Sequence, residues 1–250
     1  MTIEEHKEWF ERFARTKIAL AADASPLETK LGHTWRVLEN AEKILASENA
    51  PQKLERAGCL AALYHDLGRF DQYLRYGTFK DSLSRNHALL SVETAKRAGI
   101  LDEEPEIRSL VLAAIGLHNR RALPDIPQDD LLFLARVVRD ADKIDILRVM
   151  ADCLAGPKPY NPTVVLSLPD EDTLSPVLAE KILAGVVPDY DDLRSVNDFR
   201  LLLGAWAMDM NFAGSRQLYR TSGFGQKLVE GVPDKKPYAK IRDYLLKIME

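Results

Sequence analysis

Apolar residues along most of the chain recur every three to four positions, and this helical period restricts the fold more than any other feature. The one β-branched run, residues 163–168, is short and lies between Pro162 and Pro169. The pattern therefore predicts an all-α protein. Helices are expected at residues 3–22, 31–48, 52–67, 86–98, 105–118, 130–153, 173–185, 192–212 and 237–249.

A cluster of three prolines and a glycine within residues 155–162 predicts a domain boundary. We expect residues 1–154 to form a helical domain and residues 155–250 to form a mostly helical extension packed on it. Residues 163–250 hold no histidine, so the chemistry is expected in the first part. Four apolar residues of the extension are predicted to pack against the first part, to cover a cleft or to form a dimer contact. They are Trp206, Met208, Met210 and Phe212.

Bulk properties exclude several classes of protein. The net charge of −4 and the pI near 5.8 argue against binding of long nucleic acid through a basic face. No apolar run approaches the roughly 20 residues that cross a bilayer, and residues 1–15 form a charged amphipathic pattern rather than a signal peptide. Cys59 and Cys153 both lie in apolar helical patterns, which predicts two buried thiols in a reducing cytoplasm.

Histidines and aspartates stand where expected helices begin or end. His65 and Asp66 follow an apolar helical stretch and precede Gly68, a residue that can end the helix. A carboxylate beside an imidazole at a buried helix end needs a compensating partner, and a bound metal ion compensates both. The further candidate ligands are His33, His87, His118 and Asp142. Each histidine alone is better explained as a hydrogen-bonded core residue, whereas their joint placement favours a metal centre in a helical bundle. His6 lies among glutamates and is expected on the surface.

The order of these residues resembles the HD-domain superfamily of metal-dependent phosphohydrolases. Residues 33–37 are similar to the helix of that family's first histidine, residues 63–69 to its histidine–aspartate doublet, and residues 141–144 to its closing aspartate. The resemblance covers about residues 30–150. It implies an HD-domain helical bundle, and it assigns the closing ligand to Asp142 ahead of Asp140.

Members of this superfamily with two metal ions carry extra histidines between the doublet and the closing aspartate, and His87 and His118 match them in order and rough spacing. The resemblance thus implies that Asp66 bridges two ions. It assigns His33, His65 and Asp142 to one ion, and His87 and His118 to the other. Imidazole and carboxylate ligands suit divalent transition metals. We expect one or two ions, with Fe or Mn as the first choice and Ni, Zn or Mg as alternatives.

Polar and cationic residues next to the expected ligands are the predicted substrate contacts. Arg69 follows Asp66 by three residues, and its family counterpart contacts the substrate phosphate, so these two residues are the predicted catalytic pair. The other candidates are Asn119, Arg120, Arg121 and, in the expected loop 70–81, Tyr76. The competing interpretations are that Arg120 and Arg121 are solvated loop charges, that Asn119 caps a helix end, and that Tyr76 belongs to aromatic residues that attach the loop to the bundle. The Gly-Tyr-Pro phrase of one cyclic-dinucleotide-cleaving branch is missing after His118.

The predicted function is therefore a cytoplasmic, metal-dependent phosphohydrolase. It would cleave a phosphoester or phosphoanhydride bond of a nucleotide or another small phosphorylated metabolite, using a hydroxide generated from water at the metal centre. We expect no long nucleic acid and no membrane as partner, and a homodimer as one arrangement. The alternatives are a di-iron oxygenase of the same superfamily, whose ligand set looks nearly identical, and a non-catalytic helical signalling module.

Overall fold

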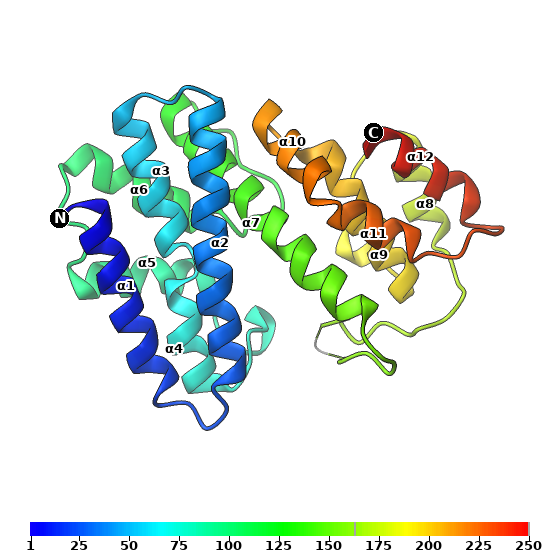
Figure 1. Ribbon diagram of the computed structural model, residues 1–250, viewed down its shortest axis with the longest axis horizontal. Coiled ribbons are helices and arrows are strands. Elements are labelled where there is room, and N and C mark those ends of the chain that lie inside the picture. Colours follow the sequence, from blue (N-terminus) through cyan, green and yellow to red (C-terminus); the bar gives the residue numbers. More distant parts are fainter. Residues whose placement is uncertain (163, 250) are drawn as a thin grey trace. The chain divides into compact units, whose positions relative to one another are not determined.

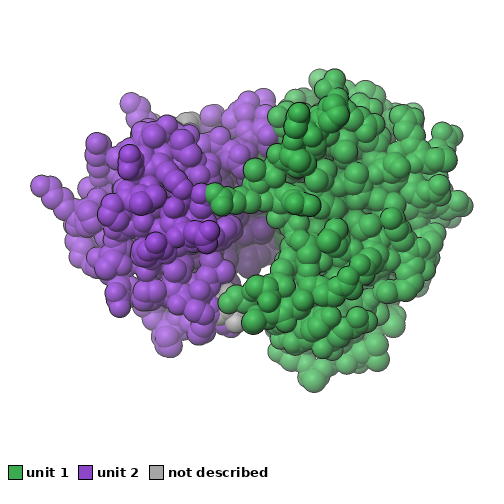
Figure 2. Space-filling view, turned by 180° about the vertical axis from the view of Figure 1, so that it is seen from behind, with its two compact units in different colours: residues 1–142 green, residues 143–250 purple. Residues whose placement is uncertain are grey.

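The computed structural model describes residues 1–162 and 164–249, and every regular element in these ranges is helical (Figure 1). The prediction of an all-α fold with a helical C-terminal part is confirmed. Contacts divide the chain into two compact units, residues 1–142 and 143–250 (Figure 2). Helix α7, Asp129–Ala155, contributes residues to both units, and the domain boundary predicted after residue 154 lies at its end. No described helix is both long and apolar enough to cross a bilayer.

The first unit is a bundle built around α3, whose residues 57–64 are all buried. Helix α3 packs against α2 and α6, α4 packs against α5, and α1 contacts α2, α3 and α4 (Figure 1). The elements preceding α7 are α1 Ile3–Ile18, α2 Ser25–Ser47, α3 Gln52–Tyr64, α4 Leu67–Tyr76, the 3₁₀ helix η1 Asp81–Leu83, α5 His87–Ala98 and α6 Pro105–Leu117.

The helix predicted at residues 52–67 is interrupted at its functional end. Helix α3 stops at Tyr64, and a new helix, α4, runs from Leu67 to Tyr76 and so replaces much of the loop predicted at residues 70–81. Gly68, which was predicted to end the helix, lies in the first turn of α4 instead. A Cβ at this glycine would stand 2.5 Å from the backbone nitrogen of Ser91 on α5. Because Gly68 has no Cβ, α4 and α5 can approach closely at this position. The chain remains helical there instead of ending the helix.

Two further predictions about the first unit were wrong. Helix α2 begins at Ser25, six residues before the predicted start at residue 31, with a proline in its first turn where the missing N–H is tolerated. His6 is fully buried rather than exposed. Its Nδ1 lies 2.8 Å from the Tyr64 hydroxyl and its Nε2 lies 3.3 Å from Glu103 Oε1. His6 occupies the same face of α1 as the buried Phe10, one turn further on.

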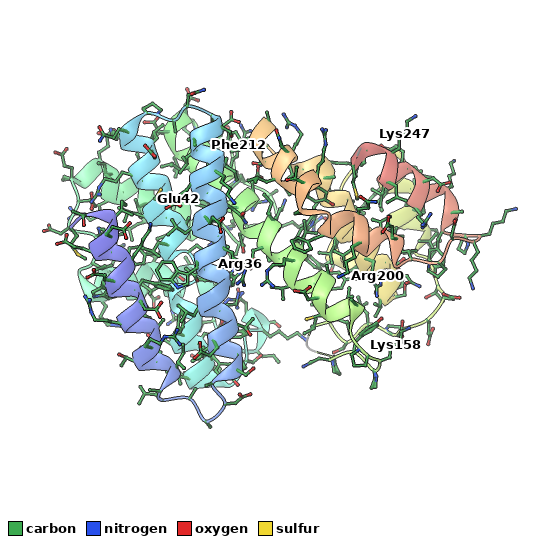
Figure 3. All side chains as sticks on the ribbon, viewed as in Figure 1. Arg36, Glu42, Lys158, Arg200, Phe212 and Lys247 are labelled. Atoms are coloured by element: carbon green, nitrogen blue, oxygen red, sulfur yellow. The ribbon has the colours of Figure 1, made fainter. Side chains whose placement is uncertain are left out.

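The second unit is a smaller helical cluster around α9. Every residue of α9 is buried. The elements of this unit after α7 are α8 Pro176–Leu183, η2 Tyr190–Asp192, α9 Val196–Ala205, η3 Trp206–Asp209, α10 Ala213–Ser222, α11 Phe224–Glu230 and α12 Ala239–Met249. The single helix predicted at 192–212 is thus divided, and α10 and α11 were not predicted. Arg200 of α9 donates to the Leu154 carbonyl near the end of α7 at 2.7 Å and to the Tyr160 hydroxyl in the segment that follows at 3.1 Å (Figure 3).

The β-branched run and the second cysteine also require comment. Thr163 lies outside the described residues, and residues 164–167 form turns rather than a strand, with Leu166 and Ser167 at positive φ. Cys59 is buried as predicted, but Cys153 is exposed because it faces away from the packed side of α7. Of the four apolar residues singled out in the extension, Trp206 and Met210 are buried, and the Lys143 ammonium lies over the Trp206 ring.

Candidate metal centre

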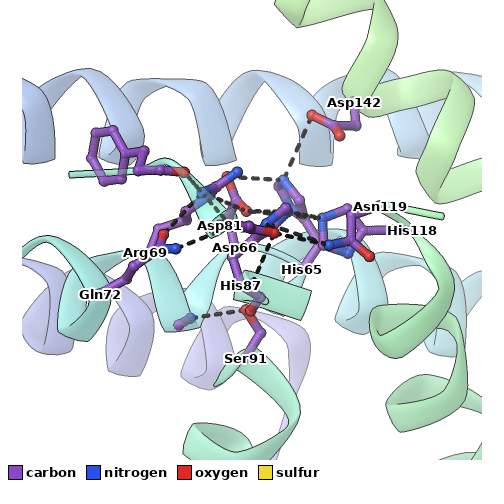
Figure 4. A network of polar contacts seen from close by, with 12 residues as sticks. His65, Asp66, Arg69, Gln72, Asp81, His87, Ser91, His118, Asn119 and Asp142 are labelled. Carbon is purple, nitrogen blue, oxygen red and sulfur yellow. Dashed lines mark hydrogen bonds and ion pairs between the residues drawn. The ribbon is translucent and has the colours of Figure 1, made fainter. Parts of the chain in front are cut away.

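The six predicted ligands converge in the first unit from six helices and their ends. Figure 4 labels all of them except His33. His65 is the residue after the last of α3, and Asp66 directly precedes α4. The interruption between these helices therefore places the doublet where its two side chains face the same cluster. The remaining ligands come from α2 (His33), the first residue of α5 (His87), the end of α6 (His118) and α7 (Asp142).

The ligand atoms form three overlapping groups, each with its atoms within 4.8 Å of one another. The groups are His33, His65 and Asp66; His65, His118 and Asp142; and Asp66, His87 and His118. The Nε2 atoms of His33 and His65 are 3.3 Å apart, and those of His87 and His118 are 3.1 Å apart. Five of these residues are buried, and the Asp142 side chain is 17% exposed. Such a density of imidazole and carboxylate atoms is typical of a metal centre.

Hydrogen bonds fix the tautomer of three imidazoles. His65 Nδ1 donates to the Ala62 carbonyl at 2.7 Å, and His118 Nδ1 donates to the Ile115 carbonyl at 2.7 Å. Because a carbonyl only accepts, Nδ1 carries the proton in both rings. His87 Nδ1 lies 2.7 Å from the Asp81 carboxylate, which imposes the same tautomer. The Nε2 lone pairs of all three rings therefore point into the cluster, as metal-ligating histidines require.

Burial disfavours protonation of the imidazoles in this cluster and favours the binding of a metal cation. Desolvation lowers the pKa of His65, and desolvation together with the neighbouring imidazoles lowers the pKa of His118 to about 3. The rings therefore stay neutral, as ligands must be. Asp66 Oδ1 is buried and accepts no hydrogen bond. A buried carboxylate oxygen without a donor is costly unless a cation contacts it. The residues present thus fit one or two divalent transition-metal ions.

Two cations contact Asp66, and one of them was not predicted. Lys30 Nζ is 2.7 Å from Asp66 Oδ2, and Arg69 Nε is 3.4 Å from Oδ1. Burial opposes ionisation of Asp66, but the charges of Lys30 and Arg69 outweigh it and hold the pKa of this carboxyl well below its usual range. Lys30 stands three residues before His33 on α2, so helical spacing alone places both on one face.

Asp81 is a second residue that sequence reasoning missed. Its Oδ2 accepts from His87 Nδ1, while its Oδ1 accepts from Gln72 Nε2 at 3.0 Å and lies 3.2 Å from Arg69 (Figure 4). Burial raises the pKa of Asp81, but the hydrogen bonds from His87 and Gln72 lower it to about 2. A carboxylate behind a ligating imidazole raises its basicity and orients it. No periodic pattern marked Asp81, because it lies in η1 between two helices.

The predicted substrate contacts are distributed unevenly. Arg69 and Asn119 belong to the polar network, since Asn119 Nδ2 lies 3.4 Å from Asp81 Oδ2 (Figure 4). Arg120 and Arg121 are exposed in the segment after α6, where the buried Arg139 guanidinium donates to both of their carbonyls. Tyr76 is 39% exposed and lines a small cavity between α4 and α5 with Arg75 and Arg85 rather than joining the network. Its predicted substrate role gains no support from these contacts.

Comparison with known families agrees with this geometry. Residues 31–147 match the sequence model of the HD domain, and this range contains all six candidate ligands. The chain therefore contains an HD domain with a buried histidine and aspartate cluster consistent with a metal site. It carries in addition a helical C-terminal part that lies outside the matched residues. No curated protein and no solved structure gives a significant match to the chain.

Proposed function

We propose that this protein is a metal-dependent phosphohydrolase that acts on a nucleotide or another small phosphorylated metabolite. The observation that supports the proposal most strongly is the combination of three converging Nε2 lone pairs with two cations beside the same carboxylate, Asp66. Bound divalent ions would supply a hydroxide nucleophile at neutral pH and positive charge for the phosphoryl oxygens. His33, His65, Asp66, His87, His118 and Asp142 would hold them.

The residues of the chain have distinct tasks in this proposal. Asp66 links the two halves of the ligand set, since it belongs to a group with His33 and to a group with His118. Arg69 presents a guanidinium suited to two phosphoryl oxygens. The exposed Arg120 and Arg121 lie two and three residues after His118 and offer further charge to a substrate with several phosphates. The acidic net charge of −4 fits a small substrate better than long nucleic acid.

A phosphate-release screen tests the function directly. Protein purified without chelator would be given nucleotides, dinucleoside polyphosphates and sugar phosphates, with Mn, Fe, Ni and Mg in parallel. We expect release that depends on the metal and is abolished by Asp66→Asn, which keeps the size of the side chain but removes its charge. Asp152→Asn is the matched control, because Asp152 is exposed and its ion pair among the described residues is with Arg148 on the same helix. This control should leave the release rate unchanged.

Three results would contradict the proposal. A metal content well below one ion per chain, with no rescue of activity by added Mn or Fe, would refute the metal centre. Stoichiometric metal without phosphate release from any substrate, accompanied by oxygen consumption when the iron is reduced, would assign the same ligands to a di-iron oxygenase. Stoichiometric metal with neither reaction would leave a binding module that keeps the HD fold.

A further inference from the structure

Lys30 is the charged residue of the cluster for which neither the ligand set nor the family pattern gives a role. It lies on α2 one turn before His33, and its side chain is 21% exposed. Within residues 1–162 and 164–249, the only carboxylate that its ammonium contacts is Asp66, at 2.7 Å. A lysine in this position neutralises the carboxylate that the metal centre needs.

Lys30 and Arg69 form a pair of cations held on one aromatic platform. The Lys30 Nζ and the Arg69 guanidinium carbon both lie 5.7 Å from the centroid of the Phe79 ring. They contact different oxygens of Asp66, Lys30 at Oδ2 and Arg69 at Oδ1. Arg69 has additional partners in Asp81 and Gln72. Lys30 therefore depends on Asp66 for its counter-charge more completely than Arg69 does.

We propose that Lys30 is a substrate-binding residue whose ammonium binds a phosphoryl oxygen, and that it becomes available only when Asp66 ligates a metal ion. The inference rests on the proposed function and names a further residue of that same site. When the Asp66 carboxylate ligates a metal cation, Lys30 loses its carboxylate partner. The Lys30 ammonium then stays beside the ligand cluster, over the Phe79 ring. An ammonium without a counter-ion at the edge of a phosphoryl site binds an anion strongly.

This arrangement predicts effects of opposite sign on two ligands. Removal of the Lys30 charge should weaken phosphate binding roughly 10- to 100-fold, the range for one hydrogen bond to a charged group. The same change should strengthen Mn²⁺ binding by about tenfold or more, because the cation that competes for Asp66 is gone. A lysine that only supports the fold would weaken both ligands together. The opposite signs therefore separate the two roles.

Calorimetric titration of inorganic phosphate into the full chain, metal-free and Mn²⁺-loaded, tests the inference. We expect phosphate to bind the loaded protein at least tenfold more tightly than the metal-free protein. Lys30→Met should lose this binding while it retains the Mn²⁺ stoichiometry, and Lys30→Arg should recover part of it. Lys43→Met is the matched control on the same helix, since Lys43 is 52% exposed and pairs only with Glu39. It should behave as the unmodified protein.

Several outcomes would overturn the role of Lys30. They are unchanged phosphate affinity in Lys30→Met, parallel loss of Mn²⁺ and phosphate in that variant, or equal phosphate affinity with and without metal. Phosphate release by the unmodified protein, measured on the same preparation, separates this inference from the proposed function. If the unmodified protein releases phosphate and Lys30→Met binds phosphate with unchanged affinity, only the proposed role of Lys30 is refuted. An Mn²⁺-loaded protein that releases no phosphate from any substrate removes the proposed function as well.

Discussion

Asp81→Asn should weaken metal binding at the His87 and His118 end of the cluster without removing any ligand. The carboxylate of Asp81 accepts the Nδ1 proton of His87 at 2.7 Å, and Asn119 and Arg69 also approach it. Asparagine keeps an acceptor of the same size but loses the charge. The His87 imidazole would then be less basic and less firmly oriented as a ligand.

The size of the effect follows from this one hydrogen bond. A hydrogen bond to a charged group contributes about 1.5–3 kcal/mol and a neutral one about 1 kcal/mol, so the loss should be about 0.5–2 kcal/mol. That difference corresponds to a dissociation constant that is roughly 2- to 30-fold larger. Removal of a carboxylate behind a ligating histidine typically costs about 10–100-fold in affinity, which overlaps this range.

Titration calorimetry with Mn²⁺, together with metal analysis after gel filtration, measures the effect. We expect one of two ions to bind more weakly in Asp81→Asn while the other is unchanged. Asp71→Asn is the control, because Asp71 is a carboxylate of α4 that pairs with Lys17 and Arg97 and contacts no ligand. Equal affinities for both ions in Asp81→Asn and the unmodified protein would refute the assignment of His87 as a ligand supported by Asp81.

Three further predictions concern packing, thiols and pH. Gly68→Ala should destabilise the fold by about 1–3 kcal/mol in urea unfolding, because its Cβ meets the α5 backbone, whereas Gly116→Ala, which meets only one methyl group at 3.8 Å, should not. An aromatic disulfide reagent should label the exposed Cys153 quickly and Cys59 only after unfolding, since burial raises the pKa of Cys59 to about 12; equal rates would contradict this. Burial lowers the pKa of His6. The neutral His6 ring therefore stabilises the fold above the unfolded-state pKa of about 6.5, and this stabilisation is lost as the pH falls below that value. Compared with His6→Gln, the unmodified protein should lose up to about 1.4 kcal/mol more per pH unit between pH 6.5 and 5.5, and parallel pH profiles would refute this.

The sequence alone determined the fold class and the identity of the six ligand candidates. Helical periodicity is a local property, so the apolar spacing of α3, α5, α6 and α7 was sufficient to place them within a few residues. The ligands were recognisable because histidines at the ends of apolar helices are out of place on a solvated surface. The same spacing contained two signals that were not used. His6 shares a helix face with Phe10, and Lys30 shares one with His33.

Only the tertiary structure decided how these residues meet. The close approach of α4 to α5 depends on the contact of Gly68 with Ser91, a neighbour more than twenty positions away, and no local pattern encodes it. The place of Asp81 behind His87 likewise depends on the packing of η1 against two helices. Contacts of this kind are made by residues remote in sequence, and their energies depend on burial and distance rather than on residue type. For this reason the ligands were predicted from the chain, and their supporting charges Lys30 and Asp81 were found only in the folded protein.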